Sequence, residues 1–162
     1  MSEIYNRIVN DLNKTRRDTM FSPSLLDSLS EEERKIVEKE IIKYCLLGDS
    51  VFFDYLGYLK CYDLQEVFNE ESLKNVTTTK RALIYKRLYF ITKNNLYISR
   101  LYELSKVDIN AYSILTIMYN KNDVDRSVMY PALERFTTIN DTYRMMFETR
   151  CKNNVDNELK QL

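Results

Sequence analysis

The fold is decided by residues 30–60, which read SEEERKIVEKEIIKYCLLGDSVFFDYLGYLK. Ser30 followed three residues later by Glu33 forms a capping box, in which each residue's side chain bonds to the other's main chain, so a helix begins here. Gly48 can adopt the left-handed conformation that ends a helix, and Asp49 or Ser50 can cap a new one. The stretch therefore predicts two helices joined by a tight turn.

Apolar residues recur at helical spacing on both sides of this turn, which predicts two buried stripes that face each other. The stripe of the first helix contains Ile36, Val37, Ile41, Tyr44, Cys45 and Leu47, and that of the second contains Val51, Phe52, Leu56 and Leu59.

The composition favours an all-α protein. The 162 residues include 44% hydrophobic ones but only two Gly and two Pro, too few for the turns of an all-β fold or for a glycine-rich phosphate loop. One domain spanning residues 1–162 is expected.

Lys plus Arg equals Asp plus Glu at 24 each, which argues against a nucleic-acid partner held by bulk charge.

The helix, turn and helix pattern returns at residues 79–104 and again at 108–136. Val37, Ile42 and Cys45 align by counting with Leu83, Leu88 and Ile91. Because a single hairpin cannot bury its apolar face alone, stacked antiparallel hairpins in an α-solenoid of about seven to nine helices are predicted. A non-repeating helical bundle is the alternative.

Outside the hairpins, shorter elements are predicted from local signals. Residues 1–29 form an N-terminal helical cap, with an amphipathic helix over 3–20 and a short turn of helix after Ser22 and Pro23. Asp63 with Glu66 predicts another short helix, and 69–79 reads as the longest loop. Stacked hairpins occupy 30–152, including a final helix that begins at Asn140 or Asp141, and 153–162 form a frayed tail.

Residues 37–60, VEKEIIKYCLLGDSVFFDYLGYLK, resemble the helix, Gly-Asp turn and helix of small bacterial HEAT-like repeat proteins. The resemblance covers 31–60 well and 79–136 loosely. It implies paired helices stacked into a curved slab that binds proteins or nucleic acids. Several such proteins look like immunity proteins encoded beside bacterial toxins, and the resemblance implies that role here.

Catalysis is not expected, because the chain has no histidine and therefore no Ser-His-Asp, Cys-His or HExxH site. The acidic runs Glu31 to Glu33 and Glu70 to Glu71 read as a helix cap and a loop. No cofactor or metal is implied. Cys45, Cys61 and Cys151 have no metal-ligand spacing and are expected to be reduced thiols.

With neither a signal peptide nor a long apolar run in view, a cytoplasmic location without membrane contact is expected.

Thirteen tyrosines without a tryptophan suggest a contact surface, since tyrosine serves half-buried core edges and binding surfaces alike. Tyr55, Tyr58 and Tyr62 flank the buried stripe of the second helix and are expected to point sideways or outward. Counting across the repeat places Tyr55 beside Arg100 and Tyr58 beside Glu103. The predicted partner-binding residues are Asp54, Tyr55, Tyr58, Tyr62, Arg100 and Glu103.

A non-catalytic protein-binding module, of the immunity-protein type, is the function these observations favour. The alternative is a HEAT-like nucleic-acid module using the basic residues Arg16, Arg17, Lys80, Arg81, Lys86 and Arg87. A histidine-free enzyme would need a pocket in which an acid has a strongly shifted pKa. The sequence leaves the oligomeric state open.

Overall fold

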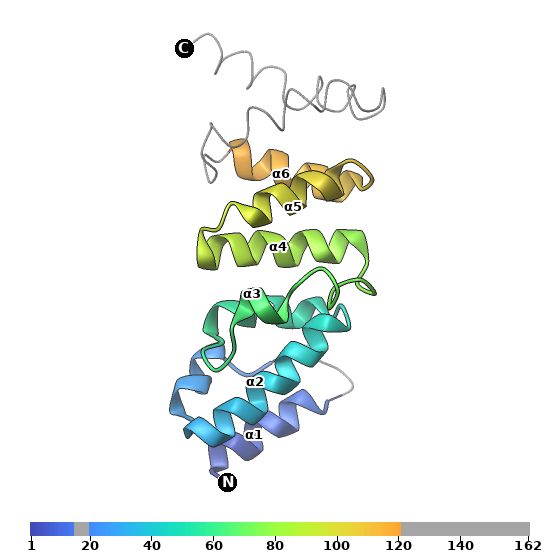
Figure 1. Ribbon diagram of the computed structural model, residues 1–162. Helices are drawn as coiled ribbons and strands as arrows, with labels where there is room; N and C mark the ends of the chain where they lie inside the picture. The colour runs from blue at the N-terminus through green and yellow to red at the C-terminus, as the bar shows by residue number, and fades with distance from the viewer. Residues whose placement is uncertain (15–19, 121–162) are drawn as a thin grey trace. The chain divides into compact units, whose positions relative to one another are not determined.

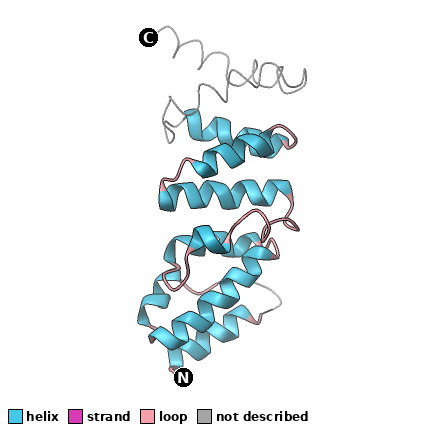
Figure 2. Ribbon diagram, in the orientation of Figure 1, coloured by secondary structure: helices cyan, strands magenta, loops and turns pink. Residues whose placement is uncertain are grey.

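A computed structural model describes residues 1–14 and 20–120, and these form eight helices and no strand (Figures 1 and 2). The all-α prediction is confirmed. The helices are α1 (Glu3–Leu12), η1 (Pro23–Ser28), α2 (Glu31–Leu46), η2 (Ser50–Tyr58), α3 (Leu64–Val67), α4 (Thr78–Thr92), α5 (Leu96–Ser105) and α6 (Ile109–Asn120). None of them, within the described ranges, is long and apolar enough to cross a membrane.

The chain divides into two compact units, Met1–Ile91 and Thr92–Leu162. Their boundary falls inside the second predicted hairpin, at the last residue of the helix α4. The stacked solenoid and the single domain therefore stay predictions. The second helix of the third hairpin, the final helix and the tail lie outside the described residues.

The first hairpin forms as its caps predict. The Glu33 N–H donates to Ser30 Oγ at 3.3 Å and the Ser30 N–H to Glu33 Oε2 at 3.2 Å, which completes the capping box of α2. At the other end Gly48 has φ +79°, while the Asp49 N–H donates to Tyr44 O at 3.0 Å and the Gly48 N–H to Cys45 O at 2.9 Å. These two bonds are a Schellman motif, which turns the chain back along α2.

The second helix of this hairpin is a 3-10 helix, not the α-helix whose period the stripe assumed. With three residues per turn, side chains three apart lie directly above one another. Phe52 and Tyr55 form one buried row, and Phe53, Leu56 and Leu59 form a second. The outward row contains Val51, Asp54 and Gly57.

The buried face of α2 also differs from the predicted stripe. Val37, Ile41 and Cys45 are buried as expected, whereas Ile36 is exposed and Leu47 is 72% exposed. Arg34 and Glu38 replace them on the buried face, because positions 34, 38, 41 and 45 follow one side of the helix.

The helix α1 is shorter than the predicted 3–20, since it ends at Leu12 with Asn13 as its C-cap. Ser2 caps its start by accepting the Tyr5 N–H at 3.1 Å. Ser2 also donates through its main-chain N–H and its hydroxyl to the Glu33 carboxylate, which lowers the pKa of Glu33. The starts of α1 and α2 are thereby joined.

Three contacts align the helix α4 with η2 and with the turn that precedes it. Lys80 lies against Gly48, Arg87 pairs with Asp54, and Ile91 lies against Gly57. Residue numbers rise together on both helices, so the two run parallel. The connection between them consists of α3 and the predicted loop, whose residues Leu73 and Val76 are buried.

In the second unit, α5 packs against α6. Asp108 caps α6, as predicted, by accepting the N–H groups of Asn110 at 2.8 Å and Ala111 at 3.0 Å. The most deeply buried side chains of the pair include Tyr97, Ile98, Leu101, Tyr112, Leu115 and Met118.

Candidate partner-binding surface

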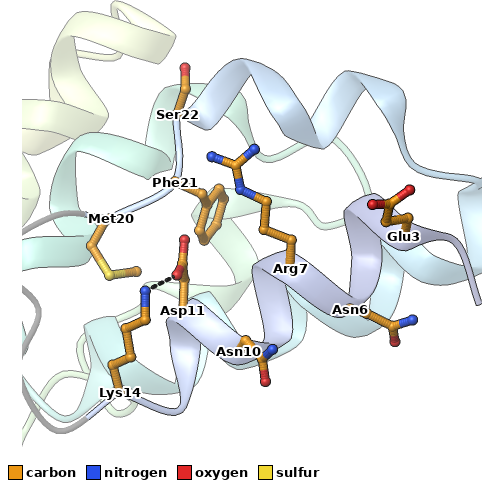
Figure 3. Close-up of a pocket in the computed structure, with 9 residues that line it drawn as sticks. All are labelled: Glu3, Asn6, Arg7, Asn10, Asp11, Lys14, Met20, Phe21 and Ser22. Carbon is orange, nitrogen blue, oxygen red and sulfur yellow. Dashed lines mark hydrogen bonds and ion pairs between the residues drawn. The ribbon is translucent and has the colours of Figure 1, made fainter.

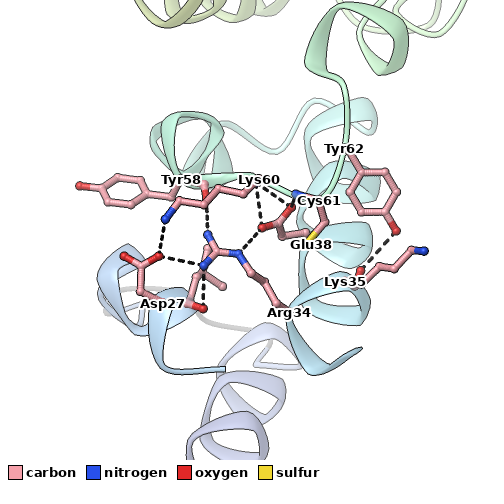
Figure 4. A network of polar contacts seen from close by, with 9 residues as sticks. Asp27, Arg34, Lys35, Glu38, Tyr58, Lys60, Cys61 and Tyr62 are labelled. Atoms are coloured by element: carbon pink, nitrogen blue, oxygen red, sulfur yellow. Dashed lines mark hydrogen bonds and ion pairs between the residues drawn. The ribbon is translucent and has the colours of Figure 1, made fainter. Parts of the chain in front are cut away.

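Tyr58, the last residue of η2, presents its side chain at the surface with 43% of the residue exposed. The predicted exposure of this tyrosine is confirmed. The main chain of Tyr58 is fixed by Arg34, because Arg34 Nη2 donates to Tyr58 O at 2.6 Å. Figure 4 shows the ring pointing away from that contact.

The holding group is a buried ion pair within α2, between Arg34 and Glu38. Arg34 Nε donates to Glu38 Oε1 at 2.7 Å, and Glu38 is 0% exposed. The Glu38 carboxylate also accepts the main-chain N–H of Lys60 at 3.0 Å and that of Cys61 at 2.8 Å. We call Arg34 and Glu38 the clamp, because together they bind the main chain at three positions from 58 to 61.

The clamp reaches η1 as well. Arg34 Nη1 donates to Leu26 O at 3.0 Å and to Asp27 Oδ1 at 2.8 Å, while Lys60 Nζ donates to the same Asp27 oxygen at 2.7 Å (Figure 4). The bonds from Lys60 and Arg34 lower the pKa of Asp27. Burial disfavours the Arg34 charge, but its hydrogen bonds to Asp27 and Glu38 outweigh this and raise its pKa.

Tyr62 lies beyond the clamp and is partly exposed, and its hydroxyl donates to Lys35 O at 3.3 Å. A hollow of about 510 Å³, which we call the Arg34 hollow, opens beside this segment. It is lined by Leu29, Glu31, Arg34, Lys35, Lys60 and Cys61. Partial burial and the nearby Glu38 raise the pKa of the Cys61 thiol, which keeps it protonated at neutral pH.

Tyr55 was expected to point sideways or outward, and this prediction is wrong: Tyr55 is 4% exposed. In the 3-10 helix it lies directly above Phe52, with ring centroids 5.8 Å apart, and its ring packs on Phe21 at 5.0 Å. Its hydroxyl donates to Phe21 O. Burial, with the charges of Asp11 and Asp54, raises the pKa of Tyr55 to about 12, so this residue belongs to the core.

The other predicted contact residues are the exposed Asp54 and Glu103 and the partly buried Arg100. Asp54 is exposed and pairs with Arg87 of α4. On α5 in the second unit, Glu103 is exposed and pairs with Lys106 at 2.9 Å, while the Arg100 guanidinium lies 5.8 Å from the Tyr97 ring centroid. The predicted proximity of Arg100 and Glu103 to the tyrosines of η2 stays a prediction.

The arrangement around the clamp binds main chain and is poorly suited to proton transfer. The Glu38 carboxylate accepts N–H groups from Arg34, Lys60 and Cys61, and its complete burial separates it from any substrate. Cys45 is also buried, and loss of hydration with the nearby Asp49 raises the pKa of its thiol to about 12. Across residues 1–14 and 20–120, no group of His, Cys, Asp or Glu could hold a metal ion.

The basic residues of the nucleic-acid alternative do not share one face. Lys80 and Arg87 lie on the side of α4 that meets η2, and Arg87 is neutralised by Asp54. Arg81 and Lys86 are five residues apart, which separates them by about 140° around an α-helix. Arg16 and Arg17 lie outside the described residues.

A larger hollow of about 880 Å³ lies between α1 and the segment that enters η1 (Figure 3). Its lining residues are Glu3, Asn6, Arg7, Asn10, Asp11, Lys14, Met20, Phe21 and Ser22. Asp11 and Lys14 pair within it, and Glu3 and Arg7 supply one further charge of each sign. This balanced lining selects no class of ligand.

Sequence reasoning missed the clamp, because charged residues on a helix are normally assigned to the solvent face. A signal was nevertheless present: Arg34 and Glu38 are four apart and align with Ile41 and Cys45 on the buried side. Comparison of the chain with protein-family models, curated proteins and solved structures gives no significant match in any of the three.

Proposed function

We propose that this protein is a non-catalytic protein-binding module whose contact surface is centred on Tyr58, Lys60 and Tyr62. The observation that carries this proposal is an exposed tyrosine on a main chain fixed by a buried ion pair. Partially exposed aromatic side chains are typical anchors of protein interfaces. A fixed main chain lowers the ordering cost of binding, so the same contacts give a higher affinity.

The absence of histidine from the sequence also supports binding over catalysis, as does the engagement of the Glu38 carboxylate by N–H donors. The scattered basic residues of α4 give no support to the nucleic-acid alternative.

More specifically, we propose that the partner is a bacterial toxin that this protein neutralises. This form rests on the resemblance of residues 37–60 to immunity-type HEAT-like proteins. Co-expression with a toxin encoded beside its gene tests it. We expect cells to survive only when the chain is present, and death in its presence would reject the immunity role.

Capture of a partner by the immobilised full chain from lysate of its native cell tests the general proposal. Tyr58→Ala should lose the partner, whereas Val51→Ala should retain it. Val51 is a matched control because it lies on the same helix with a similar exposure of 40%, about 14 Å away at 2 Å per residue. Equal capture by both variants would remove Tyr58 from the contact surface.

A further inference from the structure

We infer that the Arg34 hollow receives a carboxylate side chain from an acidic loop of the protein partner. This inference rests on the proposed function and adds the chemistry of the partner. It concerns the hollow beside Tyr58 and Tyr62, which is lined by three cations, one carboxylate, a leucine and a cysteine.

The charges that line the hollow are mainly positive. Arg34, Lys35 and Lys60 stand against the single carboxylate of Glu31. The two carboxylates that pair with Arg34, those of Glu38 and Asp27, are not among the lining residues. A negatively charged group inside the hollow would therefore face mainly positive side chains.

Unused hydrogen-bond donors accompany this charge. A guanidinium has five N–H groups, and four of those on Arg34 donate to Glu38, Leu26 O, Asp27 and Tyr58 O. The fifth, on Nη2, has no acceptor among the residues that the structure describes. The Lys35 ammonium likewise has no partner within those residues, and Lys60 uses one of three N–H groups on Asp27. Carboxylates are strong acceptors for such charged donors.

The surroundings favour a carboxylate that belongs to a protein over a small free anion. Tyr58 and Tyr62 lie on either side of the clamp, outside the lining of the hollow, so only a partner larger than a small anion can reach from the hollow to these rings (Figure 4). Leu29 adds an apolar contact within the hollow. A free anion would gain only the charged contacts, whereas an acidic loop gains both kinds.

Titration of the ¹⁵N-labelled full chain with hexaglutamate peptide tests the inference by nuclear magnetic resonance. The readout is the main-chain amides of Lys60 and Cys61, because both donate to Glu38 behind the hollow. We expect saturable shifts of these two signals with hexaglutamate and none with hexalysine. Absence of saturable shifts would overturn the inference.

Paired lysine variants show whether the hollow itself holds the peptide. Lys35→Ala should weaken hexaglutamate binding by about two- to fivefold, the usual effect of one exposed ion pair. Lys39→Ala is the matched control, an exposed lysine one turn further along α2 that does not line the hollow. Equal weakening by both variants would show that hexaglutamate binds by general charge attraction and not in the hollow, which would overturn the inference. Unchanged signals elsewhere in the spectrum confirm that each variant is folded.

Two other occupants would also overturn the inference. Inorganic phosphate that shifts the same amides at lower concentration than hexaglutamate would identify a small-anion site. Shifts that grow with protein concentration in the absence of peptide would identify a second copy of this chain.

Failure of the inference can be told from failure of the proposed function. A captured partner that depends on Tyr58 but binds Lys35→Glu with full affinity would leave the binding function standing and reject the acidic loop. Hexaglutamate binding without any capture that depends on Tyr58 would keep an anion-binding hollow but reject both the proposed function and the partner's loop.

Discussion

Glu38 is the residue on which most of the candidate surface depends, since it is fully buried and accepts donors from Arg34, Lys60 and Cys61. A buried ion pair contributes little net stability compared with apolar residues, because desolvation offsets attraction. Its value here is positional: it fixes the main chain from 58 to 61, and hence the direction of the Tyr58 ring. The clamp links burial in α2 to the geometry of the surface.

Glu38→Ala should lower the free energy of unfolding by about 3–5 kcal/mol, because it leaves the Arg34 charge buried without its closest charged partner and leaves two main-chain N–H groups without their acceptor. Urea unfolding followed by circular dichroism measures this. Lys60→Ala is the control: it removes an exposed pair with Asp27 and should cost less than about 1 kcal/mol. Similar losses for both variants would mean that the clamp is not a buried organising element.

Tyr55 gives a pH-dependent prediction. Its pKa is about 12 in the folded chain and about 10 when unfolded, so the folded state keeps the phenol proton over this interval. The resulting stability is fully present below about pH 10 and is lost as the pH rises towards 12, by at most about 1.4 kcal/mol per pH unit. Unfolding measured between pH 9 and 11.5 should show a steeper decline for the native sequence than for Tyr55→Phe. Parallel declines would contradict the burial of Tyr55.

At the scale of elements, helix ends were predictable because caps are local. Ser30 with Glu33, Gly48, Asp63 and Asp108 all act as their residue types indicate. The 3-10 form of η2 was not predictable, because over nine residues periods of 3.0 and 3.6 bury Phe52 and Leu56 alike and differ mainly at Tyr55. The candidate site was therefore predicted in part: Tyr58 is exposed, Tyr55 is core, and the clamp was not foreseen.

The two glycines of the chain allow a direct test of the hairpin geometry. Gly48→Ala should destabilise by about 1–2 kcal/mol, because Gly48 has φ +79° and an added Cβ would lie 3.2 Å from Lys80 Cδ. Gly57→Ala should be neutral or stabilising by up to about 1 kcal/mol, since its Cβ would meet Ile91 at an ordinary 3.8 Å. Thermal unfolding of both variants measures the difference. Equal effects would argue against the Schellman turn.

For the whole molecule, the hairpin count along the sequence predicts a continuous solenoid, which stays a prediction because the chain divides into two units after Ile91, within the second predicted hairpin. A hydrophobic pattern identifies which face of a helix is buried but not which neighbour buries it. The parallel pairing of α4 with η2 is such a case, because it depends on the long connection through α3 and on contacts at Gly48, Asp54 and Gly57.

A fragment of residues 1–92 should fold by itself, since it contains the buried residues of the first unit, from Ile8 to Tyr89, and the whole of α4. We expect a helical circular dichroism spectrum and a single cooperative unfolding transition. A gradual loss of signal on heating would show that the first unit depends on the rest of the chain.

We propose that Tyr58, held by the clamp, anchors a protein partner. Isothermal titration of the captured partner against the native chain, Tyr58→Ala and Val51→Ala tests it most directly. We expect Tyr58→Ala to weaken affinity at least about tenfold, a loss typical of an aromatic anchor, and Val51→Ala to stay within about twofold of the native chain. An unchanged affinity for Tyr58→Ala would contradict it.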